Sequence, residues 1–414
     1  MSKHVVIIGA GVIGLCSAYY ARQRGLKVTV IERQPRDRDG CSFGNAGMVV
    51  PSHFIPLAAP GMVSLGLRWM WNPESPFYIK PRLSWDLAAW GWHFWRASTR
   101  QHVQESAPLL RDLSFASRDC FEELASLEFG LERKGLLMLC RTQHGLDEEA
   151  ATASMARELG VPADVLDAGQ IAALEPGIAM NVAGGVYYPK DCHLNPRAFL
   201  SVLQRELERN GVAFLWETEV ESWDCDAWEA RAVRTNHGEV AADEFVISGG
   251  SWSMQLLSGL NIRLPMQAGK GYSLTMQNPR VTPKTCAILT EARVAVTPMS
   301  GTLRFGGTME LAGMNESVNQ RRIGGIIRAA TEYYPEFNPE DFSHIPPWHG
   351  MRPCSPDGLP YLGRTVYYDN LVIATGHAMM GLSLGPVSGR IVANLLAGEA
   401  AGFDLQMLSP DRYA

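Results

Sequence analysis

Three glycines near the start of the chain have the spacing of a nucleotide-binding turn. Gly9, Gly11 and Gly14 follow the β-branched run at 4–8 and open a helical pattern. In such a turn the first glycine permits a tight bend, the second lets the backbone approach a pyrophosphate, and the third lets the helix pack closely on the strand. Glu32 lies 18 residues after Gly14, near the spacing of about 20 at which an acid meets a ribose hydroxyl. The pattern predicts dinucleotide binding at a helix N-terminus, and its alternative is a glycine-rich turn of the core.

Two further clusters of small residues bear on which dinucleotide binds. The first spans 41–48 (CSFGNAGM), shortly after Glu32, and the second, 376–381 (GHAMMG), follows a strand pattern at 369–375. Small residues let loop backbone approach a large planar ring. The helical pattern at 387–396 follows the second cluster, and a helix N-terminus stabilises the negative charge that reduction places on a flavin. Glycine-rich turns at both ends of the chain therefore favour FAD over NAD.

The elements that position these turns indicate a mixed α/β protein. The N-terminal turn joins strands at 4–8 and 27–31 through a helix at 15–24, which is a βαβ unit. The run at 264–310 alternates apolar and polar residues between turns, as an antiparallel sheet over a pocket does. We therefore expect a Rossmann-like FAD-binding domain interleaved with a substrate domain built on a mixed, largely antiparallel sheet.

The order of these patterns indicates that both domains are discontinuous. With 414 residues the chain has room for two or three domain-sized units. Helical patterns at 85–96 and 107–127 separate the first FAD segment from a strand at 135–140. We expect the FAD-binding domain to comprise residues 1–53, 143–253 and 348–414. The substrate-binding domain is then expected to comprise residues 54–142 and 254–347.

Composition limits the partners and the compartment. Hydrophobic residues make up 46% of the chain, charged residues make up 19%, and the formal net charge is −6. A globular protein of this charge has no general electrostatic attraction to nucleic acid. The eight cysteines form no CxxC and the ten histidines no HExxH, so we expect no metal site. Sparse cysteines suit a reducing compartment, so we expect a cytoplasmic protein whose uncharged stretch 4–21 belongs to the fold and not to a signal peptide.

Several short stretches, taken in order along nearly the whole chain, resemble one family. Beside the N-terminal fingerprint they are 42–47 (SFGNAG), 58–61 (AAPG), 270–275 (KGYSLT), 350–353 (GMRP), 355–358 (SPDG), 375–377 (TGH) and 408–413 (LSPDRY). This set resembles the small-subunit type of bacterial D-amino-acid dehydrogenase, within the superfamily of D-amino-acid oxidase, glycine oxidase and sarcosine oxidase. The resemblance implies non-covalent FAD and oxidation of an amine at its Cα. No cysteine falls where a covalent flavin link is expected.

The resemblance also assigns residues to the cofactor. The ADP half falls on Gly9, Gly11, Val12, Ile13, Gly14, Glu32 and Arg33, with Val220 at the adenine and Ser248, Gly249 and Gly250 under the pyrophosphate. The flavin half falls on Ser42, Asn45, Ala46, Gly47, Met48, Gly350, Arg352, Gly376, His377, Met379, Met380, Gly381, Leu382 and Ser383. Met379 stands where glycine oxidases have an arginine, which favours the dehydrogenase branch.

Arg352 is the first candidate for a substrate contact. It matches the arginine that pairs with the substrate carboxylate in related oxidases, and a planar guanidinium fits a carboxylate with two parallel hydrogen bonds. The alternative is a structural arginine in a turn. Tyr272 is the second candidate, because its hydroxyl would meet a carboxylate oxygen, against an equal alternative of a tyrosine packed in a sheet.

Three further side chains are weaker candidates. His53 and His377 would sense or accept the amine proton near neutral pH, although hydride transfer does not demand a base. A structural role in the flavin turn is an equal alternative for His377. Lys270 would raise the flavin potential if it lay near the ring, and its alternative is a surface position.

The resemblance implies a complete reaction. Hydride passes from the Cα of a D-amino acid to flavin N5, an imine or 2-oxo acid forms, and the electrons go to a quinone or an electron-transfer protein. D-proline and hydroxy-D-proline belong to the family's substrate range. Two alternatives stay open: an oxygen-using oxidase of glycine, sarcosine or another secondary amine, and a flavoprotein subunit of a hetero-oligomeric dehydrogenase. The oligomeric state is also open.

A tryptophan cluster is the last feature with a functional interpretation. It comprises Trp69, Trp71, Trp85, Trp90, Trp92 and Trp95. Aromatic stripes are usually core, so we expect these side chains to pack inside the protein or between domains. The alternative is an exposed amphipathic face that touches a membrane or an electron-accepting partner. The family often passes electrons to a quinone at the inner membrane, so a peripheral contact there stays open.

Overall fold

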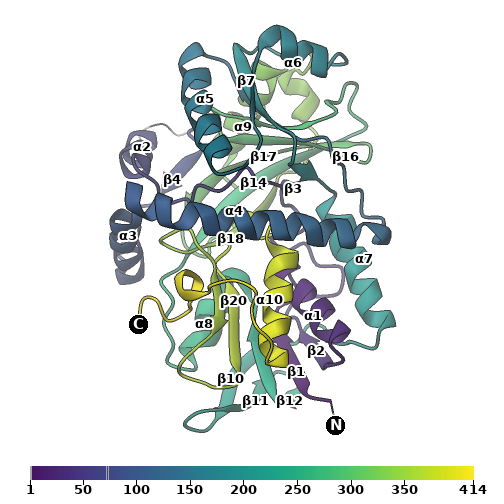
Figure 1. The fold of residues 1–414 in the computed structure, drawn as a ribbon, viewed down its shortest axis with the longest axis vertical. Helices are drawn as coiled ribbons and strands as arrows, with labels where there is room; N and C mark the ends of the chain where they lie inside the picture. Colours follow the sequence, from purple (N-terminus) through teal and green to yellow (C-terminus); the bar gives the residue numbers. More distant parts are fainter. Residues whose placement is uncertain (1, 71, 73) are drawn as a thin grey trace.

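Two large sheets organise the molecule, one in each half of Figure 1. The computed structural model describes residues 2–414 except 71 and 73. The sheet in the lower half has the order β19-β20-β13-β1-β2-β9, and all its strands except β19 run parallel. Its strands are β1 (His4–Ile8), β2 (Lys27–Ile31), β9 (Ala213–Leu215), β13 (Glu244–Ile247), β19 (Tyr361–Arg364) and β20 (Leu371–Thr375).

The parallel strands are apolar on both faces because both faces are covered. One face packs on α1 (Val12–Gln23) and α10 (Gly385–Ala397), with α4 (Arg100–Glu123) and α7 (Pro196–Arg209) in the same core. The other face packs on the antiparallel strands β10 (Val220–Cys225), β11 (Ala230–Thr235) and β12 (Gly238–Ala241), and on α8 (Ser253–Ser258). A Cβ on Gly389 of α10 would lie 2.4 Å from the Cys16 carbonyl carbon of α1, so a glycine is needed at this close approach.

The second sheet forms the upper half. Its order is β18-β14-β17-β16-β15-β5-β7-β6, with β4 also paired to β17. The strands are β4 (Phe77–Ile79), β5 (Leu136–Cys140), β6 (Asp164–Asp167), β7 (Gly184–Tyr188), β14 (Gln267–Gln277), β15 (Cys286–Leu289), β16 (Val294–Met299), β17 (Thr302–Leu311) and β18 (Trp348–Cys354). One face packs on α9 (Gln320–Tyr333) and α6 (Ala168–Leu174), and the other packs on α5 (Gln143–Glu158). The helix α4 crosses between the two halves in Figure 1.

Most of the predicted elements are confirmed. The βαβ unit, the strand at 135–140, the helix at 387–396 and the antiparallel sheet at 264–310 are all present. The helix predicted at 107–127 is the later part of α4, which begins at Arg100 behind the N-cap Thr99. The segment 213–225 holds two separate strands, β9 and β10, because the chain turns between them at Glu217 with φ +52°.

The sheet pairing departs from the predicted domain boundaries in two places. We expected 143–253 to return to the FAD-binding domain, but β6 and β7 lie in the upper sheet, where β7 pairs with β5. The alternation of helix-like and strand-like stretches there does not reveal which sheet a strand joins, because pairing partners are distant in sequence. Likewise β18, at the start of 348–414, is an edge strand of the upper sheet beside β14.

The expectation that the tryptophans pack inside was wrong for three of them. Trp85, Trp92 and Trp95 are 91%, 56% and 57% exposed on α3 (Trp85–Ala97), whereas Trp90 is 4% exposed and donates to the Cys354 carbonyl at 2.9 Å. Trp90 and its stacked neighbour Phe94 lie on the side of the helix that faces the protein. The other three tryptophans lie on the opposite side and face outward. Trp69 is half-buried on α2 (Met62–Trp69), and Trp71 lies outside the described residues.

Candidate functional site

A cavity of about 830 Å³ lies between the two sheets. Its floor is made where β1, β2, β13 and β20 of the parallel sheet end, which is the edge of an open α/β sheet at which ligands bind. Its roof comes from β14, β17 and β18 of the upper sheet. The volume falls in the range of about 300–1,000 Å³ usual for cofactor and ligand sites.

The turn after β1 is a close-packed backbone cradle. Gly9 has φ +107°, and a Cβ there would lie 2.6 Å from the Ser248 carbonyl oxygen. A Cβ on Gly14 would lie 1.9 Å from the Gly9 carbonyl oxygen. Gly11 caps α1 without a side chain, so the first-turn N–H groups face the cavity end of the helix. These features fit a pyrophosphate on the helix N-terminus, as the sequence predicted.

The acidic residue at the end of β2 is held by backbone donors. Glu32 Oε2 accepts from the Ala10 N–H at 2.8 Å, and Oε1 accepts from the Gln34 N–H at 2.9 Å. Each carboxylate oxygen has a second lone pair, so Glu32 still has acceptor sites for the hydroxyls of a ribose. Arg33 stacks on the Trp252 ring, with the guanidinium carbon 3.9 Å from the ring centroid.

Sequence reasoning missed Arg38 at this end of the cavity. Its guanidinium is buried, lies 4.0 Å from Glu32 and donates to the Ala10 carbonyl. Burial lowers the pKa of Arg38, and Glu32 opposes that shift. The run at 32–39 (ERQPRDRD) contains no signal that separates Arg38 from Arg36, which pairs with Glu208 at the surface.

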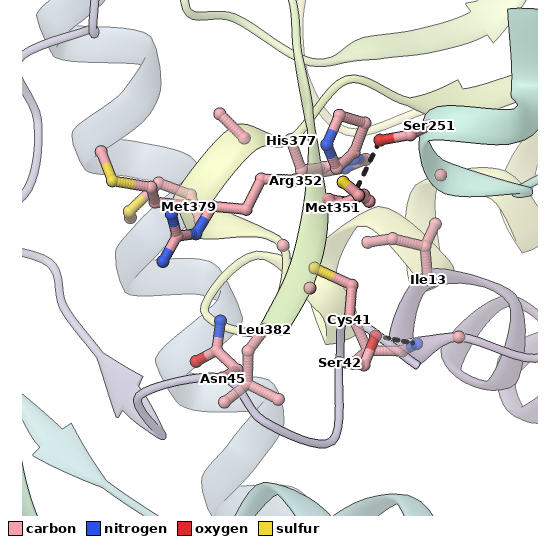
Figure 2. Close-up of a pocket in the computed structure, with 18 of the residues that line it drawn as sticks. Ile13, Cys41, Ser42, Asn45, Ser251, Met351, Arg352, His377, Met379 and Leu382 are labelled. Atoms are coloured by element: carbon pink, nitrogen blue, oxygen red, sulfur yellow. Dashed lines mark hydrogen bonds between the residues drawn. The ribbon is translucent and has the colours of Figure 1, made fainter. Parts of the chain in front are cut away.

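The small-residue loop at 42–48 is held by hydrogen bonds to residues that are distant in sequence. Ser42 Oγ accepts from the Val12 N–H at 3.0 Å (Figure 2). Arg304, which the sequence analysis missed, donates to the carbonyls of Phe43 and Asn45 from β17. Just beyond the loop, the Val50 N–H donates to Ser383 Oγ at 3.0 Å and joins it to the C-terminal turn. The loop is therefore a rigid wall of the cavity.

His377 has a structural role in the C-terminal turn. Its Nε2 lies 2.9 Å from Ser388 Oγ of α10, and burial lowers the pKa of His377 to about 3. The ring is therefore neutral at physiological pH and positions the turn that precedes α10. Met379, in the same turn, is 48% exposed and lies near Arg352 in Figure 2.

The cavity gathers nearly all of the predicted cofactor residues. The lining includes Gly9, Gly11, Val12, Ile13, Glu32, Arg33, Ser42, Asn45, Ala46, Met48, Val220, Ser248, Gly249, Gly250, Gly350, Arg352, His377, Met379, Met380, Gly381, Leu382 and Ser383. Gly14, Gly47 and Gly376 are not part of the lining and instead permit packing behind it. Gly47 and Gly376 both have φ +79°, and a Cβ would meet the Leu194 carbonyl and the Tyr361 ring, respectively.

Arg352 is a half-buried cation without an acidic partner among the described residues. Its Nη1 donates to the Thr308 carbonyl at 2.6 Å, and it lines the cavity from β18 (Figure 2). Burial lowers the pKa of Arg352, and only the thiols Cys41 and Cys354 oppose that shift. A buried guanidinium is costly unless an anion pairs with it. A Cβ on Gly271 of β14 would lie 2.1 Å from Nη2, so the missing side chain leaves the space that the guanidinium occupies.

Tyr272 and Lys270 form a buried cluster on β14 with Glu310 of β17. The Tyr272 hydroxyl donates to Glu310 Oε2 at 3.1 Å and accepts from the Asn319 N–H at 3.2 Å. Those bonds direct the hydroxyl to Glu310. The Tyr272 side chain also forms part of the cavity wall. Lys270 is fully buried, donates to two backbone carbonyls and lies 3.7 Å from Glu310 Oε1. The surface position considered for Lys270 was wrong, and Lys270 is not part of the cavity lining.

His53 lines the cavity near charged groups that the sequence analysis missed. Burial lowers the pKa of His53 to about 4, and Arg293 adds to the shift. Arg293 and Glu149 line the same cavity, and burial raises the pKa of Glu149. Glu149 lies in the acidic run 147–149 and Arg293 lies in a turn between two strands, so neither residue type indicated a site.

The fold and the cavity define a dinucleotide-binding oxidoreductase, and the comparisons with known proteins agree. The chain belongs to the family of FAD dependent oxidoreductases, whose pattern matches residues 4–395. FAD is therefore its cofactor, which the glycine cradle at Gly9 and Gly14 fits.

Full-length relatives extend this comparison. The chain is 32% identical to a D-amino acid dehydrogenase from Bradyrhizobium diazoefficiens and 33% identical to one from Granulibacter bethesdensis, over 99% of each chain. Among solved structures, glycine oxidase from Geobacillus kaustophilus covers 100% of both chains with a TM-score of 0.80 at 24% identity. L-proline dehydrogenase from P. horikoshii has a TM-score of 0.75 at 18% identity and covers 100% of this chain and 98% of its own. These last two likenesses show the fold.

Proposed function

We propose that this protein is an FAD-dependent dehydrogenase that oxidises D-amino acids at Cα and passes the electrons to an acceptor other than oxygen. The observation that carries the proposal is Arg352, a half-buried guanidinium in the cavity wall with no acidic partner among the described residues. A substrate carboxylate supplies the missing anion and accepts two parallel hydrogen bonds. The full-length relatives named D-amino acid dehydrogenase support the same substrate class.

The residues around the cavity orient the substrate and control its protonation. FAD bound in the cavity supplies the hydride acceptor. Arg352 fixes the carboxylate, and therefore the plane of the Cα substituents, relative to the loop at 42–48. The amine must be neutral when Cα–H leaves, so that the nitrogen lone pair forms the imine. The imine then hydrolyses to a 2-oxo acid, or stays cyclic for a substrate such as D-proline or hydroxy-D-proline.

Cys41 bears on how the cofactor is attached. It is the one cysteine among the described residues that lines the cavity, and burial raises the pKa of its thiol. A thiol of raised pKa is a weak nucleophile, so we expect FAD to be non-covalent. Acid precipitation should leave the yellow chromophore in the supernatant, and chromophore that stays with the precipitated chain would contradict this expectation.

An anaerobic visible titration tests the proposed reaction. The purified holoenzyme is mixed with D- and L-amino acids, D-proline, hydroxy-D-proline, glycine and sarcosine. Loss of the flavin absorbance with D-substrates alone is the expected result. Loss with glycine or sarcosine, and peroxide formed in stoichiometric amount in air, would establish the oxidase instead. If the isolated chain binds FAD but no substrate reduces it, the protein is a subunit that needs a partner.

The exposed face of α3 suggests where the acceptor is met. None of the helices in the described ranges is long and apolar enough to cross a membrane. Trp85, Trp92 and Trp95 nevertheless form an outward stripe, and the rings of Trp92 and Trp95 lie 5.2 Å apart. The segment 61–100 has five basic and two acidic residues within a chain of net charge −6. Exposed tryptophans with basic neighbours fit the anionic headgroup region of a lipid surface. We therefore propose a peripheral membrane contact, and a quinone acceptor, at this face.

Vesicle binding tests that contact. The holoenzyme should sediment with vesicles that contain phosphatidylglycerol and less with pure phosphatidylcholine. The triple variant Trp85→Ser/Trp92→Ser/Trp95→Ser should lose this binding and keep its FAD. Trp228→Ser is the matched control, because Trp228 is 66% exposed and lies outside the stripe. Equal binding by the triple variant, or no binding by the natural chain, rejects the contact.

A further inference from the structure

A short antiparallel pairing brings two distant loops together beside the cavity. The strands β3 (Met48–Val49) and β8 (Cys192–His193) pair, with Val49 opposite Cys192. Ser52 follows β3, and Asp191 immediately precedes β8. Asp191 is 1% exposed and Ser52 is 8% exposed, so both lie in the interior. The sequence analysis singled out neither residue.

The hydrogen bonds in this place run in one direction, from the cavity to the carboxylate. Asp191 Oδ1 accepts from the Ser52 N–H at 3.1 Å, and Oδ2 accepts from the Ser52 hydroxyl. Ser52 Oγ also lies 3.0 Å from His53 Nδ1. While Asp191 is ionised, the hydroxyl proton goes to Asp191, so Ser52 Oγ accepts from Nδ1–H and the tautomer of His53 is fixed. Nε2 is then the unprotonated nitrogen of a side chain that lines the cavity.

The two ends of this chain differ in basicity. Burial raises the pKa of Asp191 to about 7, while burial and then Arg293 lower the pKa of His53 to about 4. A proton taken from the cavity is therefore more stable on Asp191 than on His53. Other titratable groups face the two ends. Around Asp191 they are Arg118 of α4, Tyr187 and Tyr188 of β7, Cys192 and Cys286. Near His53 the charged group is Arg293, which in turn acts on Glu149 of the cavity wall.

We propose that His53, Ser52 and Asp191 form a relay that removes a proton from the substrate ammonium and stores it on Asp191 before Cα is oxidised. The inference rests on the proposed function, because it assigns the fate of the amine proton in that reaction. His53 Nε2 takes the proton from the ammonium nitrogen, the Nδ1 proton passes to Ser52 Oγ, and the hydroxyl proton of Ser52 passes to Asp191 Oδ2. The products are a neutral amine, a neutral His53 protonated on Nε2, an unchanged Ser52 hydroxyl and a neutral Asp191. No electrons move in this step, and reversal of the relay returns the proton after the product leaves.

The relay has a consequence that a merely structural role of Asp191 does not have. An enzyme without the relay can use only the small fraction of substrate whose amine is already neutral. That fraction grows as pH rises, so the defect of a relay variant disappears in alkaline solution. A structural defect persists at every pH.

The experiment is the pH profile of anaerobic flavin reduction by the D-amino acid that the panel identifies. For the natural chain, kcat/KM should fall as pH decreases below about 7, where Asp191 becomes protonated. Asp191→Asn and Ser52→Ala should each lose about a hundredfold or more in kcat/KM at pH 7, in the range typical of a proton-transfer group. Both variants should approach the natural rate near the pKa of the substrate amine, and the double variant should be no worse than either single one. Ser52→Thr should restore most of the loss.

Two further measurements keep the test decisive. Nitrogen-15 NMR of the holoenzyme should show a protonated Nδ1 for His53, and Ser52→Ala should alter that signal without any substrate present. Ser114→Ala is the matched control, because Ser114 is also a fully buried serine, and its hydroxyl makes no hydrogen bond to the described residues. A loss in Asp191→Asn that is equal at every pH, or a profile that matches the natural chain, overturns the relay. If no D-amino acid reduces the natural holoenzyme, the proposed function fails and the relay fails with it. The NMR measurement then still decides whether His53 carries its proton on Nδ1.

Discussion

The two ends of the cavity are built in opposite ways. At the dinucleotide end, glycines and small side chains at strand ends bring bare backbone to the cavity, and Gly9 and Gly14 are fixed by backbone atoms 1.9–2.6 Å from where a Cβ would lie. At the substrate end, polar side chains from distant segments converge on the cavity: Arg352 from β18, His53 from the loop after β3 and Arg293 from the turn before β16.

This difference predicts how each end fails. A backbone cradle cannot yield to a larger side chain without moving a strand or a helix, so substitutions there should remove the cofactor outright. A converging set of side chains fails one group at a time, because each supplies a separate interaction. Substitutions at the substrate end should therefore leave FAD bound and change individual kinetic constants.

The largest effect is expected at Gly14. The Cβ in Gly14→Ala would overlap the Gly9 carbonyl at 1.9 Å, and the helix α1 would have to leave the strand. We expect the purified variant to lack FAD, with an FAD Kd raised at least about a hundredfold, which corresponds to about 2.7 kcal/mol. Flavin content and calorimetric titration measure this. Gly324→Ala in α9, where a Cβ meets nothing within 4 Å, is the control, and full FAD occupancy in Gly14→Ala would refute the cradle.

Removal of the guanidinium is next in size. Arg352→Ala should lower kcat/KM by about a hundredfold or more, mostly through KM, because a charge-assisted bidentate contact to the carboxylate is lost. FAD content should be unchanged, which separates this end from the cradle. The kcat/KM of Arg352→Lys should lie between those of the natural chain and Arg352→Ala, because an ammonium supplies the charge without the planar guanidinium. Natural kinetics in Arg352→Ala would remove the residue from the substrate site.

A smaller effect is expected from the glycine that makes room for Arg352. A Cβ in Gly271→Ala would lie 2.1 Å from Nη2, and the guanidinium is the flexible end of its side chain, so it should shift and not unfold the sheet. We expect KM to rise about tenfold with FAD retained, as a misplaced charge weakens but does not abolish the contact. Gly306→Ala on the neighbouring strand is the comparison, because its Cβ would make only ordinary contacts at 3.7 Å. If both variants have the same KM, Gly271 does not position Arg352.

The same contrast explains what the sequence could predict. The cofactor end could be predicted together with its helix and strands. Its features combine residue type with short spacing: the glycine fingerprint, Glu32 and the turn at 376–381. Arg352 was found only because its segment resembles a family. Asp191, Ser52 and Arg304 reach the site through strand pairing and burial, and Arg293 reaches it from the turn between β15 and β16. Strand pairing and burial leave no local pattern in the sequence. Pairing also decided the domains, since β7 joins the upper sheet through β5 and not through its neighbours in sequence.

Burial, more than residue type, separated the outcomes of the remaining candidates. Lys270 and Tyr272 have the residue types of a site, yet Glu310 and backbone carbonyls satisfy both polar ends. The tryptophans of α3 have the composition of a core, yet only the side held by Trp90 and Phe94 is covered. Whether such a residue has a role in the site or a structural role depends on the residues it contacts in the fold, and these contacts are not visible in the local sequence.

The smallest effect expected concerns His377 and appears in stability instead of activity. Its pKa in the fold, about 3, lies below the ordinary value of 6.5, so the fold favours the neutral ring. The unfolded chain binds a proton first as pH falls, and His377 therefore costs up to about 1.4 kcal/mol of stability per pH unit between 6.5 and 3. In His377→Gln this cost is absent. Although the variant should be about 1 kcal/mol less stable at pH 7.5, because the bond to Ser388 is weakened, the difference should shrink or reverse by pH 5.

Urea denaturation of the FAD-saturated proteins at pH 7.5, 6 and 5 measures that difference. His53 and His193 have pKa values lowered to about 4 by burial, but they are present in both proteins and cancel in the comparison. His144→Gln is the control, because the His144 side chain is 84% exposed. The stability of this variant should follow that of the natural chain at all three pH values. Parallel stability curves for His377→Gln and the natural chain would mean that the ring is not held neutral in the fold. The structural role assigned to His377 would then fail, while the role of His53 would be unaffected.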